Sequence, residues 1–168
     1  MKKTIRTTII IISASLVLAT GCDDKGGDSG NGDAASKSTQ VSLAPAVDAY
    51  ETVRVALAQD DLAAATAGAA ALRDAAKAAS LEALASAAEG LAAASPDDAD
   101  AVRKAFGAAS QTLIGALAKE PKLRDTLHVF ECPMAKGYGK WVQRAEKLEN
   151  PYMGKSMPSC GSASKWEA

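Results

Sequence analysis

Apolar residues recur at intervals of three or four along the middle of the chain, from Leu43 to Lys119. This spacing places them on one face of an α-helix, and it repeats in four successive segments. The four apolar stripes are Leu43, Val47, Tyr50, Val53 and Leu57; Leu62, Ala65, Ala69, Leu72 and Ala76; Leu81, Leu84, Ala88 and Leu91; and Val102, Phe106, Ala109, Leu113 and Leu117. Between the first stripe's members, Asp48, Glu51 and Arg54 are expected to face elsewhere.

Polar residues and prolines mark the expected helix boundaries. The expected caps of the second, third and fourth helices are Asp60-Asp61, Ser80 and Ser95. Pro96 then takes the first position of the fourth helix, and Pro121 stops that helix. Because the connections are short, residues 42–120 are predicted to form an antiparallel bundle of about four Ala-rich helices.

The charged residues of these helices carry no recognisable chemistry. A solvated face is expected to contain Arg73, Asp74, Lys77, Glu82, Glu89, Arg103 and Lys104. The helical region has no Gly-rich phosphate loop, no metal-binding helix motif and no paired carboxylates in apolar surroundings. A single histidine without a partner nucleophile offers no basis for a hydrolase, so the protein is predicted not to be an enzyme.

The first residues read as a targeting signal. Basic residues open the chain, an apolar run follows over residues 9–18, and small residues then lead to Gly21 and Cys22. This order resembles the lipobox of bacterial lipoproteins. The resemblance implies that residues 1–21 are a signal peptide, cleaved after Gly21, and that Cys22 carries the lipid.

Residues 22–41 are rich in Gly, Ser and Asp, which predicts a flexible tether. The protein is therefore expected in the cell envelope, bound to the membrane through its lipid anchor on the periplasmic side, with inner and outer membrane both open. A formal charge of −1 and the absence of a basic block argue against nucleic acid as a partner.

The composition changes abruptly from Leu127, within the last part of the chain (residues 121–168), where the unusual side chains collect. These are His128, Cys132, Met134, Met153, Met157 and Cys160, together with most of the aromatic residues. Residues 127–132 are expected to be extended, which would point His128, Phe130 and Cys132 the same way. Two helical turns are expected over residues 141–148. We predict a small, irregular Cys/Met/aromatic lobe packed on the bundle.

Thiolate and thioether sulfur are soft ligands that favour Cu(I) and similar ions, and imidazole also suits copper. The metal-ligand candidates are His128, Cys132, Met134, Met153, Met157 and Cys160. An alternative reading stays open at two of them, because Cys132 and Cys160 in an oxidising compartment can instead form a disulfide. The methionines can also simply fill gaps in a small core.

The same residues resemble an uncharacterised helical domain. The resemblance lies in residues 128–135, from His128 through Cys-Pro-Met, in residues 139–141, in the Asn-Pro-Tyr segment of residues 150–157, and in Cys160-Gly161. That domain is found in bacterial lipoproteins and is appended to periplasmic adaptor proteins of copper and silver efflux pumps. The resemblance implies a role in heavy-metal efflux, buffering or tolerance, with an efflux complex as partner.

A second hypothesis needs no metal. In it, a disulfide between Cys132 and Cys160 staples the lobe, and the protein docks on an envelope partner through its aromatic residues. Sulfur atoms that converge on one pocket would favour metal binding, whereas an exposed flat patch around Trp141 and Tyr152 would favour a protein partner.

Overall fold

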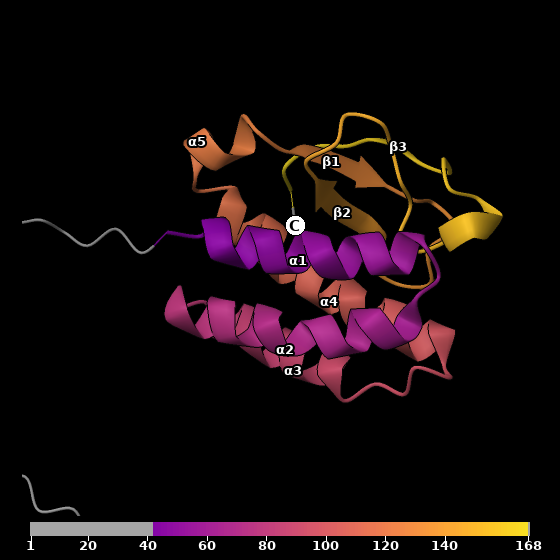
Figure 1. The fold of residues 1–168 in the computed structure, drawn as a ribbon. Coiled ribbons are helices and arrows are strands. Elements are labelled where there is room, and N and C mark those ends of the chain that lie inside the picture. The colour runs from indigo at the N-terminus through magenta and orange to yellow at the C-terminus, as the bar shows by residue number, and fades with distance from the viewer. Residues whose placement is uncertain (1–41, 168) are drawn as a thin grey trace, which may run out of the picture. The chain divides into compact units, whose positions relative to one another are not determined.

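The computed structural model describes residues 42–167, so the predicted signal peptide (1–21), the lipidated Cys22 and the tether (22–41) lie outside the described residues. The described chain is mainly helical and has a small three-stranded sheet (Figure 1). Its elements are α1 (Ala44–Ala58), α2 (Leu62–Ala78), α3 (Glu82–Ala92), α4 (Ala99–Leu117), α5 (Pro121–Arg124), β1 (His128–Glu131), β2 (Lys140–Gln143), the 3-10 turn η1 (Gly154–Ser156) and β3 (Ser162–Ala163). Within residues 42–167, none of the helices has the length and apolar character needed to cross a membrane.

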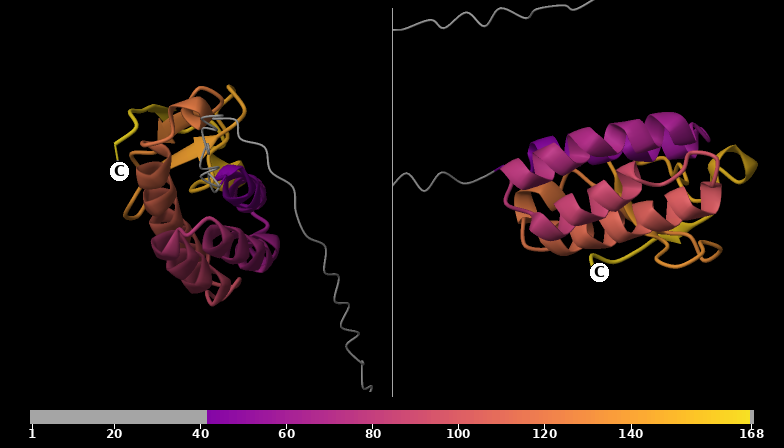
Figure 2. Two further views of the ribbon diagram at one scale, coloured as in Figure 1. Left: turned by 90° about the vertical axis from the view of Figure 1, so that its left-hand side faces the viewer. Right: turned by 90° about the horizontal axis from the view of Figure 1, so that it is seen from below.

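The four long helices pack against one another in chain order, α1 on α2, α2 on α3 and α3 on α4 (Figure 2). Connections of three residues turn the chain between the first three helices, and Asp60 and Ser80 in these connections have positive φ angles. Many buried positions are alanines, so the helices can approach closely.

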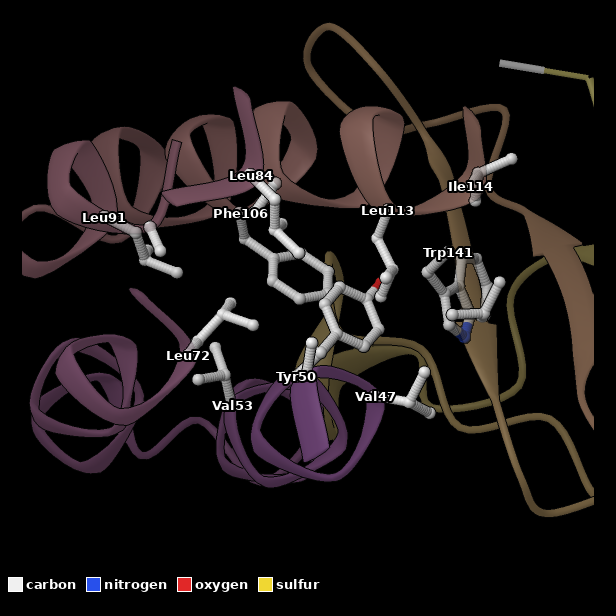
Figure 3. Close-up of a cluster of buried hydrophobic side chains, with 14 of the residues drawn as sticks. Val47, Tyr50, Val53, Leu72, Leu84, Leu91, Phe106, Leu113, Ile114 and Trp141 are labelled. Carbon is white, nitrogen blue, oxygen red and sulfur yellow. The ribbon is translucent and has the colours of Figure 1, made fainter. Parts of the chain in front are cut away.

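The predicted apolar stripes form the core. Every stripe residue is buried except the first residue of each of the first three stripes, which is half-buried. Figure 3 shows the two aromatic rings at the centre, where Tyr50 of α1 and Phe106 of α4 stack with their centroids 5.2 Å apart. The hydroxyl groups of Tyr50 and Ser110 share a buried hydrogen bond of 2.6 Å, which joins α1 to α4 as well.

One predicted cap is confirmed and two are wrong. The carboxylate of Asp61 accepts a hydrogen bond from the backbone nitrogen of Ala64 at the start of α2. Ser80 makes no such bond, because its positive φ angle places it in the turn before α3. Helix α4 begins three residues later than predicted, with Asp98 as its cap, since residues 95–98 close a hydrogen-bonded turn that contains Pro96.

Proline at position 121 does more than end a helix. Helix α4 already ends at Leu117, and Pro121 occupies the first position of the short helix α5. Proline suits this position because its missing N–H would have no partner in the first helical turn.

Two arginines that were expected on polar faces are covered by the end of the chain. Arg54 is only 1% exposed, and its guanidinium binds both carboxylate oxygens of Glu51 and the backbone carbonyl of Glu149. Arg103 donates to the carboxylate of Asp60 and to the carbonyl of Pro151. The prediction that these side chains face elsewhere or belong to a solvated face is therefore wrong, because the segment after β2 packs over α1 and α4.

In the last part of the chain three short strands form an antiparallel sheet in the order β2-β1-β3, a sheet that the sequence did not lead us to expect, and loops make up most of the rest. The extended prediction for residues 127–132 is confirmed by β1, whereas the helical turns predicted over residues 141–148 are absent. Strand β2 forms there instead, because Trp141 pairs with Phe130 across the sheet and becomes completely buried. The sheet lies along α1 and α4, on the side away from α2 and α3 (Figures 1 and 2).

Aromatic rings connect the sheet to the helices. The ring of Tyr152 lies 5.6 Å from that of Phe106 and 6.0 Å from that of Trp141, centroid to centroid. The Tyr152 hydroxyl donates to the carbonyl of Lys140 in β2. The clustering of aromatic residues near the end of the sequence thus builds the interface between sheet and helices.

Candidate functional site

The first half of the candidate site lies just beyond strand β1, where Cys132 is 3% exposed. Its backbone nitrogen donates to the carbonyl of Gly139, and its own carbonyl accepts from the nitrogen of Ala135. A Cβ atom at position 139 would lie 2.6 Å from the Cys132 carbonyl oxygen, so only glycine lets the chain pass so close. This tight loop keeps Cys132 at the edge of the core.

The second half is placed by the register of the sheet. Glu131 of β1 pairs with Ser162 of β3, which brings the residues just outside the pair together. Cys160 enters this position from a turn in which its nitrogen donates to the carbonyl of Met157. As a result, the sulfur atoms of Cys132 and Cys160 lie 3.8 Å apart, although 28 residues separate them in the sequence.

This separation suits two kinds of chemistry. Both cysteines are free thiols in the structure. Two sulfur ligands at about 2.3 Å from one tetrahedral metal ion lie roughly 3.8 Å from each other. A disulfide needs a sulfur–sulfur distance of about 2.05 Å, which side-chain rotation and a small backbone shift could supply. The pair can therefore chelate a thiophilic ion or close into a disulfide.

The environment of Cys160 favours the protonated thiol. The pKa of Cys160 is raised, first because burial disfavours the thiolate and then because the Cys132 thiol lies beside it. Metal ions bind thiolate, so binding here must release protons. We therefore expect metal affinity at this pair to increase with pH.

Two of the predicted methionine ligands lie together, but in a pocket that neither cysteine lines. Met134 and Met153 both border an open pocket of about 330 Å³ between the helices and the loops of the sheet region. Met134 is 57% exposed and Met153 is half-buried. The two thioethers thus form a group separate from the thiol pair.

The charges around the pocket lined by Met134 and Met153 do not favour a cation. Three basic residues, Arg103, Lys104 and Lys136, line it together with two acidic ones, Asp60 and Asp100. Arg103 and Asp60 form an ion pair of 2.5 Å, and Lys136 and Asp100 form one of 2.6 Å. The excess of positive charge would oppose a metal ion at the thioethers, so the thiol pair is the better candidate.

His128 lies too far along β1 to join either group. It is exposed and borders a different hollow, together with Phe130 and Trp166. A strand advances about 3.3 Å per residue, so four steps along the chain separate His128 from Cys132 by about 13 Å. A single metal ion cannot bridge that span. The predicted shared direction of these residues therefore does not bring them into one site.

Met157 is half-buried and lines neither hollow. Its contribution to the site is its backbone carbonyl, which accepts from Cys160. Of the six predicted ligands, Cys132 and Cys160 thus lie next to each other, and Met134 and Met153 line a separate pocket. Within residues 42–167, no three His, Cys, Asp or Glu side chains are grouped so that they could hold one metal ion.

The surface offers no aromatic docking patch at the place where one was considered. Trp141 is completely buried and Tyr152 is 7% exposed. Among the described residues, Met134 is the only large hydrophobic side chain that is exposed. The hypothesis of an exposed patch around these two aromatic residues is therefore wrong, because both rings face the helices.

Sequence reasoning missed the role of Asn150, which it named only as part of the Asn-Pro-Tyr segment. Asn150 is completely buried, and its side chain bonds to the backbone of Tyr152, Met153 and Cys160. An asparagine before a proline is a known turn signal. That signal could have indicated a local side-chain bond, but not the long-range bond to Cys160.

Comparison with known proteins adds no relatives. No protein-family model matches the sequence, and no curated protein or solved structure matches it either.

Proposed function

We propose that this chain is a lipid-anchored protein of the cell envelope that binds a soft metal ion through Cys132 and Cys160. The observation that carries the proposal is the 3.8 Å separation of the two sulfur atoms, brought together from positions 28 residues apart. In this proposal the four long helices form an antiparallel bundle that supports the sheet and its two cysteines.

The ligand set favours Cu(I) over zinc. Thiolates select soft ions, and structural zinc sites need four protein ligands. The described residues supply two adjacent thiols without a third His, Cys, Asp or Glu grouped with them. By the softness and number of its ligands the pair suits a monovalent soft ion better, although linear coordination by two thiolates alone would require the sulfurs to move slightly farther apart than 3.8 Å.

The burial of the two cysteines suits reversible binding. Cys132 is buried, whereas Cys160 is half-buried and gives an incoming ion access. We propose a role in buffering copper or passing it to a heavy-metal efflux complex, and the predicted lipid anchor at Cys22 would hold the protein near such a membrane complex. The proposed activity is binding and transfer, without catalysis.

A second candidate function is a disulfide-stapled envelope module that binds no metal. The same proximity of the thiols supports it, because a disulfide would join β1 to the segment before β3. Such a bond closes a loop of about 30 residues and would stabilise the protein by about 2–4 kcal/mol. Its docking surface would have to lie elsewhere than at Trp141 and Tyr152.

The test is an anaerobic Cu(I) titration of the full chain, extracted from membranes in detergent, in competition with a chromogenic chelator. Thiols are counted before and after reduction. We expect the reduced protein to compete for Cu(I), and to lose this binding when Cys132 and Cys160 are both changed to Ser. A Met134→Leu, Met153→Leu variant is the matched control, and we expect it to retain the binding.

The outcomes separate the two candidates. Absence of Cu(I) competition by the reduced protein would refute the metal proposal. If the isolated protein then has no free thiols until it is reduced, the disulfide module remains. The loss of binding in the Met variant alone would move the metal site to the second pocket.

A further inference from the structure

Asn150 is a buried polar residue whose hydrogen bonds converge on one of the two site cysteines. Its side-chain nitrogen donates to the carbonyl of Cys160, and its backbone nitrogen donates to the carbonyl of Pro158. Its side-chain oxygen accepts from the nitrogens of Tyr152 and Met153, at 2.7 and 3.0 Å. The residue is 0% exposed, so water cannot replace these partners.

The bonds of Asn150 close one loop of the chain. The side-chain oxygen of Asn150 bonds to the turn at residues 152–153, and its side-chain and backbone nitrogens bond to residues 158–160. The loop is also attached to the end of α1, because the nitrogen of Lys155 donates to the carboxylate of Asp60. Asn150 therefore links Cys160 to a loop that is attached to the helices.

The attachment on the C-terminal side of Cys160 is short. On its C-terminal side the chain is held by β3, which has only two residues, Ser162 and Ala163, both exposed. Gly161 must pass close to the carbonyl of Glu131, and its φ angle of +140° suits glycine. A strand this short restrains its neighbours poorly, although the nitrogen of Ser164 also donates to the carbonyl of Val129. The backbone of Cys160 itself is held by the bond from its nitrogen to Met157 and by the bond from the Asn150 side chain to its carbonyl.

We propose that Asn150 is a positioning residue that sets Cys160 against Cys132 before any metal ion or oxidant arrives. Preorganisation of this kind raises affinity because the ordering cost is met during folding. The inference deepens the proposed metal function and rests on it for the role of the pair. The proximity of the thiols, however, can be measured without metal.

The first measurement is the thiol–disulfide equilibrium of the full chain in a glutathione buffer without metal. In this exchange the two thiols lose two electrons and two protons to glutathione disulfide, which yields two glutathione molecules and the Cys132–Cys160 disulfide. The equilibrium constant reports how closely the protein holds the two sulfurs. The second measurement is Cu(I) affinity of the reduced protein.

Two variants remove the bond to Cys160 in different ways. Asn150→Asp keeps the acceptor for residues 152 and 153 but replaces the donor with an oxygen. Asn150→Ser keeps a short local acceptor for the turn and adds no charge. Ser110→Ala is the matched control, because it removes a buried hydrogen bond between α1 and α4 and leaves every hydrogen bond of Asn150 and of the two cysteines in place.

We expect both Asn150 variants to lower the equilibrium constant for disulfide formation about tenfold, as the loss of one buried hydrogen bond implies. Ser110→Ala should leave that constant unchanged, even if it lowers the unfolding midpoint as much as the Asn150 variants do. Unchanged constants in both Asn150 variants would overturn the inference. If one variant does not fold, the other decides the question.

The two proposals fail separately. A lower disulfide constant in the Asn150 variants, with no Cu(I) binding by any form, would support the positioning role and refute the metal function. Equal Cu(I) affinity and equal disulfide constants in wild type and both variants would support the metal function and refute the positioning role.

Discussion

The helical region and the sheet region of this protein are ordered by different means. In α1 to α4 the buried side chains are almost all apolar, and they follow the helical period of the sequence. In the sheet region two buried polar residues, Gln143 and Asn150, bond the loops to one another. The side-chain amide of Gln143 alone donates to the carbonyls of Ala145 and Lys147 and accepts from Trp141.

This difference indicates where a single substitution should affect stability most. A periodic apolar face is supported by many similar contacts, and each contact can be anticipated from its neighbours in the sequence. A loop held by one amide depends on bonds between distant residues. Five substitutions, from the largest expected effect to the smallest, test this contrast.

The largest effect is expected at the centre of the helical core. Phe106→Ala removes a fully buried ring that contacts Tyr50 and Tyr152, and it should destabilise the protein by about 3–5 kcal/mol. Urea unfolding followed by circular dichroism would measure the change. Met134→Ala is the control, since its side chain is exposed, and it should change stability by less than about 0.5 kcal/mol.

The next effect concerns the link between the two regions. Arg54→Ala removes a buried guanidinium and leaves Glu51 and the carbonyl of Glu149 without their donor. The guanidinium of Arg54 pairs with the carboxylates of Glu51 and Glu149, and both carboxylates keep some contact with solvent. We therefore expect the protein to lose about 2 kcal/mol of stability, which is below the range for fully buried ion pairs. Arg73→Ala, on the polar side of α2, should have almost no effect, and equal losses would contradict the proposed link.

A similar effect is expected where the loop of the sheet region meets the helices. Gly154 has a φ angle of +53°, and a Cβ atom there would collide with the carboxylate of Asp60. Gly154→Ala should cost about 1–3 kcal/mol from the strained backbone conformation, in addition to any displacement of that carboxylate. Gly90→Ala provides the control, because position 90 is open and helical, and it should stabilise slightly.

The smallest effects compare one tyrosine from each region. Tyr50→Phe breaks the buried bond to Ser110 and should cost about 1–2 kcal/mol. Within residues 42–167 the buried hydroxyl of Tyr138 has no hydrogen-bond partner, so Tyr138→Phe should be neutral or stabilising. Thermal and urea unfolding at pH 7 would measure both, and a clear loss in Tyr138→Phe would reveal a partner for its hydroxyl.

The same tyrosine predicts a pH dependence. Burial, followed by the charge of Glu131, raises the pKa of Tyr138 to about 12. In the unfolded chain the Tyr138 hydroxyl ionises near pH 10, whereas in the folded chain it stays protonated up to a higher pH. Stability should therefore decrease as pH rises from about 10 to 12, and the decrease should be shallower in Tyr138→Phe, as urea midpoints across this range would show.

The candidate site was only partly predictable from sequence. The pairing of Cys132 and Cys160 was among the expectations, because they are the only two cysteines after Cys22. The other four predicted ligands do not join them. Residue type indicates which atoms can bind a metal, but the strand that carries His128 also moves it away from Cys132, and the charges near Met134 come from elements distant in sequence.

By itself, the sequence determined the four long helices and their buried faces, since helical periodicity is a local property that neighbouring residues express together. It also determined the extended segment at residues 128–131. Only the tertiary structure decided that Trp141 lies in a strand, that Arg54 is buried, and that Asn150 reaches Cys160. These outcomes depend on pairing between distant segments, and a pairing energy exists only once both partners are in place.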